Sequence, residues 1–106
     1  MKNFRTYELA KNFYLECEKL KLPSYMKNQL NRASLSIVLN LSEGAAKTSA
    51  KERTKFYLTS YASFKESQSI LDLKNLHSLI HKYDILGAYL FKLSHPSPIL
   101  PVCRPP

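Results

Sequence analysis

The chain has 106 residues, and its 16 lysines and arginines against 8 aspartates and glutamates give a formal net charge of +8. A chain of this length forms one domain with a core of its own, which excludes large multidomain enzymes. Its hydrophobic content of 44% is that of a folded globular protein and not of a disordered one. The 2 glycines are too few for the turns of a β-sandwich or for a glycine-rich phosphate loop, so an all-helical fold is favoured.

The cysteine content and the hydropathy pattern indicate a cytoplasmic protein. Cys17 and Cys103 allow at most one bridge, which favours a reduced setting over a disulfide-rich secreted one. The most apolar run, 35–41, is interrupted by two polar residues, and the N-terminal segment interleaves charges with apolar residues. Neither segment resembles a signal peptide or a membrane span, so no membrane association is expected.

Two helices are predicted in the first half of the chain. Apolar residues at three- and four-residue spacing indicate a helix over residues 3–22, which Pro23 ends. Ser24 is the expected N-cap of a second helix that ends near Gly44. The core face of this second helix is expected to carry Leu30, Ala33, Ile37 and Leu41.

Two further helices are predicted in the second half. Ser49 and Glu52 have the spacing of a capping box, and the helix that follows is expected to reach about His81. Asp84 is the expected N-cap of a shorter helix over residues 85–93.

The end of the chain is rich in proline. Residues 95–106 contain all but one of the 6 prolines, which excludes a helix or a central strand there. The sequence therefore predicts two parts: an all-α domain over residues 1–94 and an extended proline-rich tail over residues 95–106. Helices joined by short connections indicate an antiparallel up-down four-helix bundle with a short fourth helix.

The predicted second helix carries a narrow polar stripe. At 100° per residue, one sector about 80° wide contains four polar side chains: Arg32, Ser36, Asn40 and Glu43. Apolar residues flank this stripe on both sides, whereas a helix facing solvent has a broad polar face. The stripe therefore indicates a subunit interface or a hydrogen-bonded interior network, and a partly hydrated groove between helices is the alternative.

If the stripe is buried, the guanidinium of Arg32 needs a carboxylate partner. Glu66 on the third predicted helix and Glu43 on the second are the candidates, and both are assigned to the same network. Removing one member of a buried ion pair costs about 3–5 kcal/mol, so Arg32→Ala is expected to destabilise the fold.

The helical segments together resemble a known family. The similar residues are Phe4, Tyr7, Leu9, Ala10 and Phe13; then Gln29, Leu30, Arg32, Ala33, Ser36, Ile37, Asn40, Glu43 and Gly44; and then Ser49, Glu52, Phe56, Leu58, Ser63 and Glu66. Over about residues 3–83 the chain resembles the four-helix-bundle proteins encoded by intervening sequences in bacterial 23S rRNA genes, which are similar to the accessory protein of diversity-generating retroelements. The resemblance implies a ring-like homopentamer that associates with nucleic acid and has no catalytic activity.

Two basic clusters are the strongest functional signal apart from the resemblance. The first surrounds the turn between the second and third predicted helices: Lys47, Lys51, Arg53 and Lys55. The second lies at the opposite end of the second helix: Lys19, Lys21 and Lys27. A net charge of +8 attracts polyanions, and lysines that only solvate helix ends are the structural alternative.

The predicted function is therefore that of a non-enzymatic, self-associating protein that binds RNA or DNA mainly through phosphate contacts. The alternative is an oligomeric scaffold that docks an acidic protein partner, such as a nucleic-acid enzyme. Sequence-specific readout is not expected, because no zinc-finger spacing and no RNA-binding strand signature is present. No cofactor is expected.

Three other features bear on function. His77 and His81 share a helix face but supply only two of the ligands that a metal needs, and His95 or Cys103 would have to fold back from the proline-rich tail to complete a site. The aromatic residues Tyr57, Tyr61 and Phe64 can stack on bases, but at helical spacing they are expected to be core residues. Cys17 is expected to pack as a small apolar residue.

Overall fold

The computed structural model describes residues 4–96, which form five helices and no strand. The helices are α1 (Phe4–Glu18), α2 (Ser24–Ala45), α3 (Ala50–Leu73), α4 (His77–Lys82) and α5 (Asp84–Ser94). The predicted all-helical fold is confirmed. Residues 97–106, which contain Cys103 and most of the expected proline-rich tail, lie outside the described residues.

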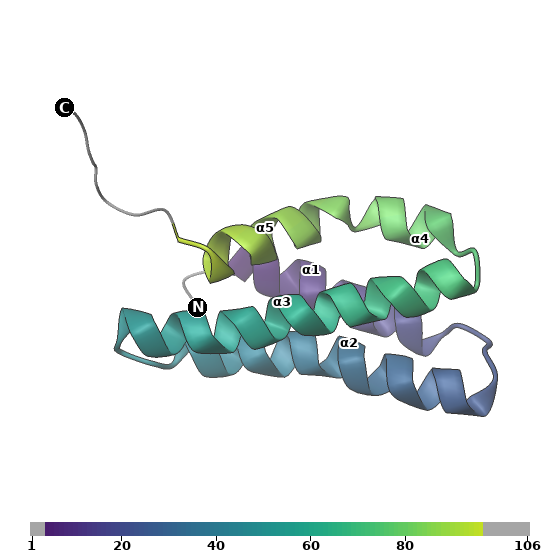
Figure 1. Cartoon of the computed structure of the whole chain (residues 1–106), viewed down its shortest axis with the longest axis horizontal. Coiled ribbons are helices and arrows are strands. Elements are labelled where there is room, and N and C mark those ends of the chain that lie inside the picture. The colour runs from purple at the N-terminus through teal and green to yellow at the C-terminus, as the bar shows by residue number, and fades with distance from the viewer. Residues whose placement is uncertain (1–3, 97–106) are drawn as a thin grey trace.

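The helices pack around one core (Figure 1). The long helices α2 and α3 run antiparallel as a hairpin, α1 packs against α2, and α5 packs against α3. The fully buried side chains at the centre include Phe13, Phe64, Leu71, Leu86 and Leu90. The predicted core face of the second helix is buried throughout, as expected: Leu30, Ala33, Ile37 and Leu41.

The contact between α2 and α3 is close. Gly44 is buried within α2, and a Cβ added there would lie 2.7 Å from Cε1 of Tyr57 on α3. The helix ends at Ala45, near the predicted position, but the glycine serves close packing and not a left-handed helix end. Farther along the seam, the buried hydroxyl of Ser60 donates a hydrogen bond of 2.8 Å to the carbonyl of Ile37. Small side chains at these positions let the two backbones approach.

The caps at the starts of α2 and α3 differ. Ser49 caps α3 as predicted, because its hydroxyl accepts a hydrogen bond of 3.4 Å from the amide of Glu52. For α2 the prediction is wrong by one residue, since the N-cap is Pro23 and no side chain caps this end. Ser24 is instead the first residue of the helix.

The third helix is shorter than predicted, because α3 ends at Leu73 and does not reach His81. Asn75 adopts a φ of 58°, a left-handed conformation that asparagine tolerates better than most residues. The amide of Leu76 then donates to the carbonyl of Leu71 at 2.9 Å, which is the Schellman pattern of a helix end. This turn separates α3 from α4.

The end of the predicted third helix is a separate helix, α4, and the predicted fourth helix corresponds to α5, with Tyr83 between α4 and α5. The Tyr83 ring is buried against Phe13, with ring centroids 5.1 Å apart, and its hydroxyl donates to Glu16 at 2.5 Å. The ammonium of Lys82 lies 2.7 Å from the same carboxylate, and both contacts lower the pKa of Glu16. Asp84 is part of α5 and does not cap it; its carboxylate lies 3.7 Å from the ring of His81.

The first helix is also shorter than predicted and ends at Glu18. The ammonium of Lys27, on the first turns of α2, donates hydrogen bonds to the carbonyls of Glu18, of Leu20 and, at 3.3 Å, of Cys17. The last carbonyls of a helix have no partner within it and carry partial negative charge. Lys27 therefore caps α1 from the neighbouring helix.

We expect Lys27→Met to lower the free energy of unfolding by about 1–3 kcal/mol, because the substitution removes a charged donor from several carbonyl groups while keeping the aliphatic stem. Chemical denaturation followed by circular dichroism measures this change. Lys21→Met is the matched control, since Lys21 is exposed and its replacement should change stability by less than about 0.5 kcal/mol. Equal stability of the two variants would show that Lys27 does not cap α1.

Candidate nucleic-acid interface

Two of the four cations predicted at the α2–α3 turn hold the turn together. The ammonium of Lys47 lies 3.4 Å from the carboxylate of Glu43 and 5.2 Å from the centroid of the Phe56 ring. Nη1 of Arg53 donates to the carbonyls of Lys47 at 3.2 Å and of Thr48 at 2.9 Å. Lys47 is thus held by a carboxylate and a ring, and Arg53 by two carbonyl groups of the α2–α3 connection, so neither side chain is free to bind a ligand.

The other two cations of this cluster point to solvent. Lys51 and Lys55 are exposed one turn apart on α3, and within residues 4–96 neither ammonium group has a hydrogen bond or an ion pair. Lys65 is a third exposed, unpaired lysine on the same side of the helix. At 100° per residue the three positions fall within a sector about 80° wide. We call Lys51, Lys55 and Lys65 the α3 basic face; helical periodicity alone would have revealed Lys65 as a member.

The fold adds two further cations to the end of the molecule where α2 meets α3. The first turn of α1 and the last turn of α5 lie at that same end (Figure 1). They carry Arg5 and Lys92, whose side chains are exposed. Sequence spacing does not indicate these two residues, because their position depends on the arrangement of the helices.

The second predicted cluster is only partly available. Lys19 and Lys21 are exposed in the connection between α1 and α2, at the opposite end of α2 from the α2–α3 turn (Figure 1). Neither makes an ion pair with another described residue. Lys27 is engaged by the carbonyls at the end of α1 and does not belong to this exposed pair.

The polar stripe of α2 divides into a seam and an exposed part. Ser63 on α3 donates to the hydroxyl of Ser36 at 2.9 Å, and Nδ2 of Asn40 donates to the carbonyl of Ser36 at 2.9 Å. These side chains are half-buried between α2 and α3. Glu66, which was expected to accept from Arg32, accepts from the amide of Gln29 instead.

Arg32 and Glu43 form the exposed part of the stripe. Within the described residues Arg32 has no ion pair. Glu43 pairs with Lys47 instead, so Arg32 pairs with neither of its expected partners. The expected loss of stability in Arg32→Ala therefore has no basis in the single chain. Beside these residues, Leu35 and Leu39 are 39% and 56% exposed, which leaves an apolar strip on the outer side of α2.

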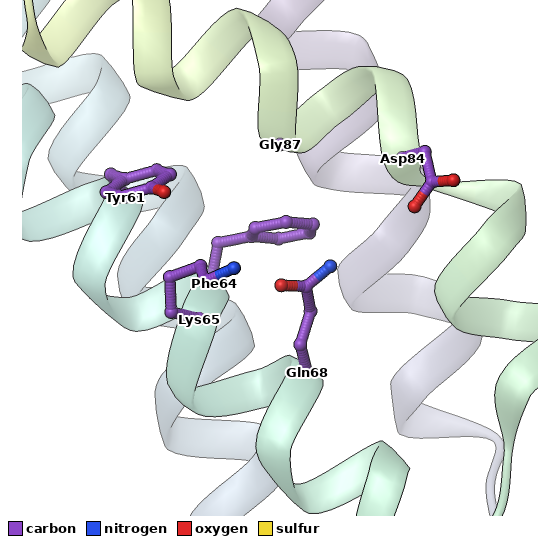
Figure 2. A pocket seen from close by; sticks show the side chains of 6 residues that line it. All are labelled: Tyr61, Phe64, Lys65, Gln68, Asp84 and Gly87. Carbon is purple, nitrogen blue, oxygen red and sulfur yellow. The ribbon is translucent and has the colours of Figure 1, made fainter.

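The aromatic residues of α3 separate by depth. Tyr57 and Phe64 are buried, as expected of core residues. Tyr61 is half-buried at the rim of a groove of about 230 Å³ between α3 and α5. Figure 2 shows the residues that line this groove: Tyr61, Phe64, Lys65, Gln68, Asp84 and Gly87.

The remaining candidate residues are His77 and Cys17. His77 lies 3.8 Å from Asp72, and residues 4–96 contain no group of three or more side chains able to hold a metal ion. Cys17 is fully buried, as expected, and burial raises the pKa of its thiol to about 12. No helix in the described part of the chain is long and apolar enough to cross a membrane.

Comparison with known proteins identifies the family. In the comparisons made, no curated protein and no solved structure matches the chain. A family model described as 23S rRNA-intervening sequence protein matches residues 2–89, which include all of α1 to α4 and about half of α5. The chain therefore belongs to the 23S rRNA-intervening sequence protein family.

Proposed function

We propose that the protein binds RNA or DNA through phosphate contacts made mainly by the α3 basic face, and that it is not an enzyme. The observation that carries this proposal is that Lys51, Lys55 and Lys65 are exposed on one side of one helix without carboxylate partners among the described residues. A row of lysine ammonium groups attracts phosphates without requiring a particular base sequence. Lys19 and Lys21 supply a second, smaller site at the other end.

Several acidic side chains are paired with cations that do not belong to the α3 basic face. Glu16 contacts Lys82 at 2.7 Å, Glu43 contacts Lys47 at 3.4 Å, and Glu8 contacts Lys11 at 3.9 Å. The positive charge that remains unpaired therefore lies on solvent-facing lysines and arginines. Such a surface raises both the affinity for a polyanion and the rate of association.

A scaffold that docks an acidic protein is the second candidate. Leu58, which is 44% exposed, lies on the side of α3 that carries the basic face. A face that combines an exposed leucine with lysines also suits an acidic protein surface that has an apolar centre. The two candidate functions differ in the ligand of Lys51 and Lys55, which is a nucleic acid in the first and an acidic protein in the second.

We expect labelled structured RNA and duplex DNA to bind the protein with an affinity that falls linearly on a log–log plot against salt concentration. The variant Lys51→Glu/Lys55→Glu should bind more weakly at every salt concentration and show a shallower slope. Fluorescence anisotropy across a salt series measures both quantities. The control Lys11→Glu/Lys74→Glu changes the net charge equally but lies outside the basic face, so it should lose much less affinity.

Arg53 is left unchanged in this design because its guanidinium holds the α2–α3 turn. Equal losses in the two double variants would mean that net charge alone, and not the α3 basic face, sets the affinity. Absence of binding to either nucleic acid at low salt would contradict the proposed function and favour the scaffold.

We further propose that the protein self-associates through the outer side of α2, as the homopentamer that the family resemblance implies. Leu35 and Leu39 provide exposed apolar area, and the exposed guanidinium of Arg32 can find a carboxylate on a neighbouring copy. Burying such leucines is worth about 1.5–3 kcal/mol each when they become fully enclosed. A ring of identical copies also repeats the basic face, which increases avidity for a long polyanion.

We expect size-exclusion chromatography with light scattering to give five times the chain mass of 12.2 kDa. Leu39→Glu should shift the protein to a monomer, because the substitution places a charge in the apolar strip. Leu73→Glu is the matched control, since Leu73 is 72% exposed at the end of α3, and the control should keep the parent mass. A parent protein that is monomeric at all concentrations would contradict self-association.

A further inference from the structure

Three rings lie in contact at the edge between α3 and the end of α5. Phe91 and His95 are stacked, with centroids 4.1 Å apart and planes at 17°. The Tyr61 ring meets both of them edge-on, at 5.6 Å from Phe91 and 5.7 Å from His95. We call these three residues the aromatic edge.

The aromatic edge is open to solvent, unlike the other rings that pack between the helices. Phe91 is 48% exposed and His95 is exposed, whereas Phe13, Phe64 and Tyr83 are almost completely buried. Exposed aromatic rings forgo the free energy that burial would give them. Because the rings already form a short stack, another flat ring can extend it with little rearrangement.

The aromatic edge continues into the groove between α3 and α5, since Tyr61 belongs to both. Figure 2 shows the side chains of Lys65 and Gln68 rising from α3 at this groove, with Asp84 at its far rim. The ring of Phe64 forms the floor, and it fits because residue 87 is glycine: a Cβ there would lie 2.8 Å from Cε2 of Phe64. The groove therefore joins ring faces to polar side chains.

Two polar groups in this groove are free to bind a ligand. Within residues 4–96, neither the amide of Gln68 nor the ammonium of Lys65 has a hydrogen-bond partner. A glutamine amide offers both donors and an acceptor, which match the edge of a nucleobase, and a lysine offers positive charge to a phosphate. Asp84 is the one carboxylate of the groove, and it lies 3.7 Å from His81.

We propose that the aromatic edge stacks unpaired bases of a single-stranded nucleic acid, with Gln68 on a base edge and Lys65 on the adjoining phosphate. Aromatic rings beside an unpaired lysine supply the stacking and the positive charge that single-strand-binding proteins combine. The free amide of Gln68 adds a group that can hydrogen-bond to a base edge. Lys92, next to Phe91 in the chain, adds positive charge beside the aromatic edge. This inference depends on the proposed nucleic-acid function and adds that the ligand has exposed bases.

The test compares two strands with equal charge. One is an oligoadenylate strand of about 12 nucleotides, and the other is an abasic strand of the same length, which has the phosphates without the bases. We expect the parent protein to bind the oligoadenylate at least about fivefold more tightly in fluorescence anisotropy, because stacking adds to the phosphate contacts. A base-paired duplex should behave like the abasic strand after allowance for its higher charge.

The variant Tyr61→Leu/Phe91→Leu removes two rings but keeps apolar side chains of similar size. It should abolish the preference for the oligoadenylate and leave the affinity for the abasic strand unchanged. Tyr25→Leu is the matched control, because Tyr25 is 74% exposed on the first turn of α2, at the opposite end of the hairpin. The control should keep the full preference, and circular dichroism should show that both variants are folded.

The possible outcomes distinguish a failure of the base-stacking inference from a failure of the proposed function. Equal binding of both strands by the parent protein would overturn base stacking while leaving phosphate binding intact. Absence of binding to either strand would contradict the proposed function itself. If the double variant keeps the preference but changes the mass in light scattering, the aromatic edge contacts another copy of the chain, and the inference is wrong.

Discussion

The close approach of α2 and α3 is the constraint on which the rest of the molecule depends. A helix pair can pack this tightly only where small side chains face each other, and Gly44 opposite Tyr57 leaves no room for even a Cβ atom. The Ser60 hydroxyl fixes the rotation of α3 by reaching the carbonyl of Ile37. With one side of α3 held against α2 and another covered by α5, the remaining side must face solvent, and that side carries the α3 basic face.

A strongly basic chain uses some of its cations for its own folding. Lys27 caps α1 from a neighbouring helix, and Arg53 binds carbonyl groups of the connection between α2 and α3. Because helix ends expose partly negative carbonyl groups, a lysine or an arginine near one is drawn to it as it would be to a phosphate. The cations that can bind a ligand are therefore fewer than the 16 lysines and arginines of the chain, and among the described residues they are those whose side chains have no partner.

Much of the helical framework was predictable from the sequence, because local patterns decide it. The core face around Ile37 and the cap at Ser49 follow from spacing and residue type. The early end of α3 was missed because an asparagine at position 75, and not a glycine, adopts the left-handed conformation. The roles of Lys27 and of Phe91 were missed because each depends on a contact between helices that sequence spacing does not encode.

The most direct measurement is a map of where nucleic acid touches the full-length chain. RNA that contains 4-thiouridine would be cross-linked to the protein by light, and the attached peptides would be identified by mass spectrometry. The prediction is that cross-links occur in residues 51–65 of α3 and in residues 87–95, at the end of α5, where the basic face and the aromatic edge lie. Cross-links confined to residues 19–27, around the turn that Lys27 holds, would contradict it.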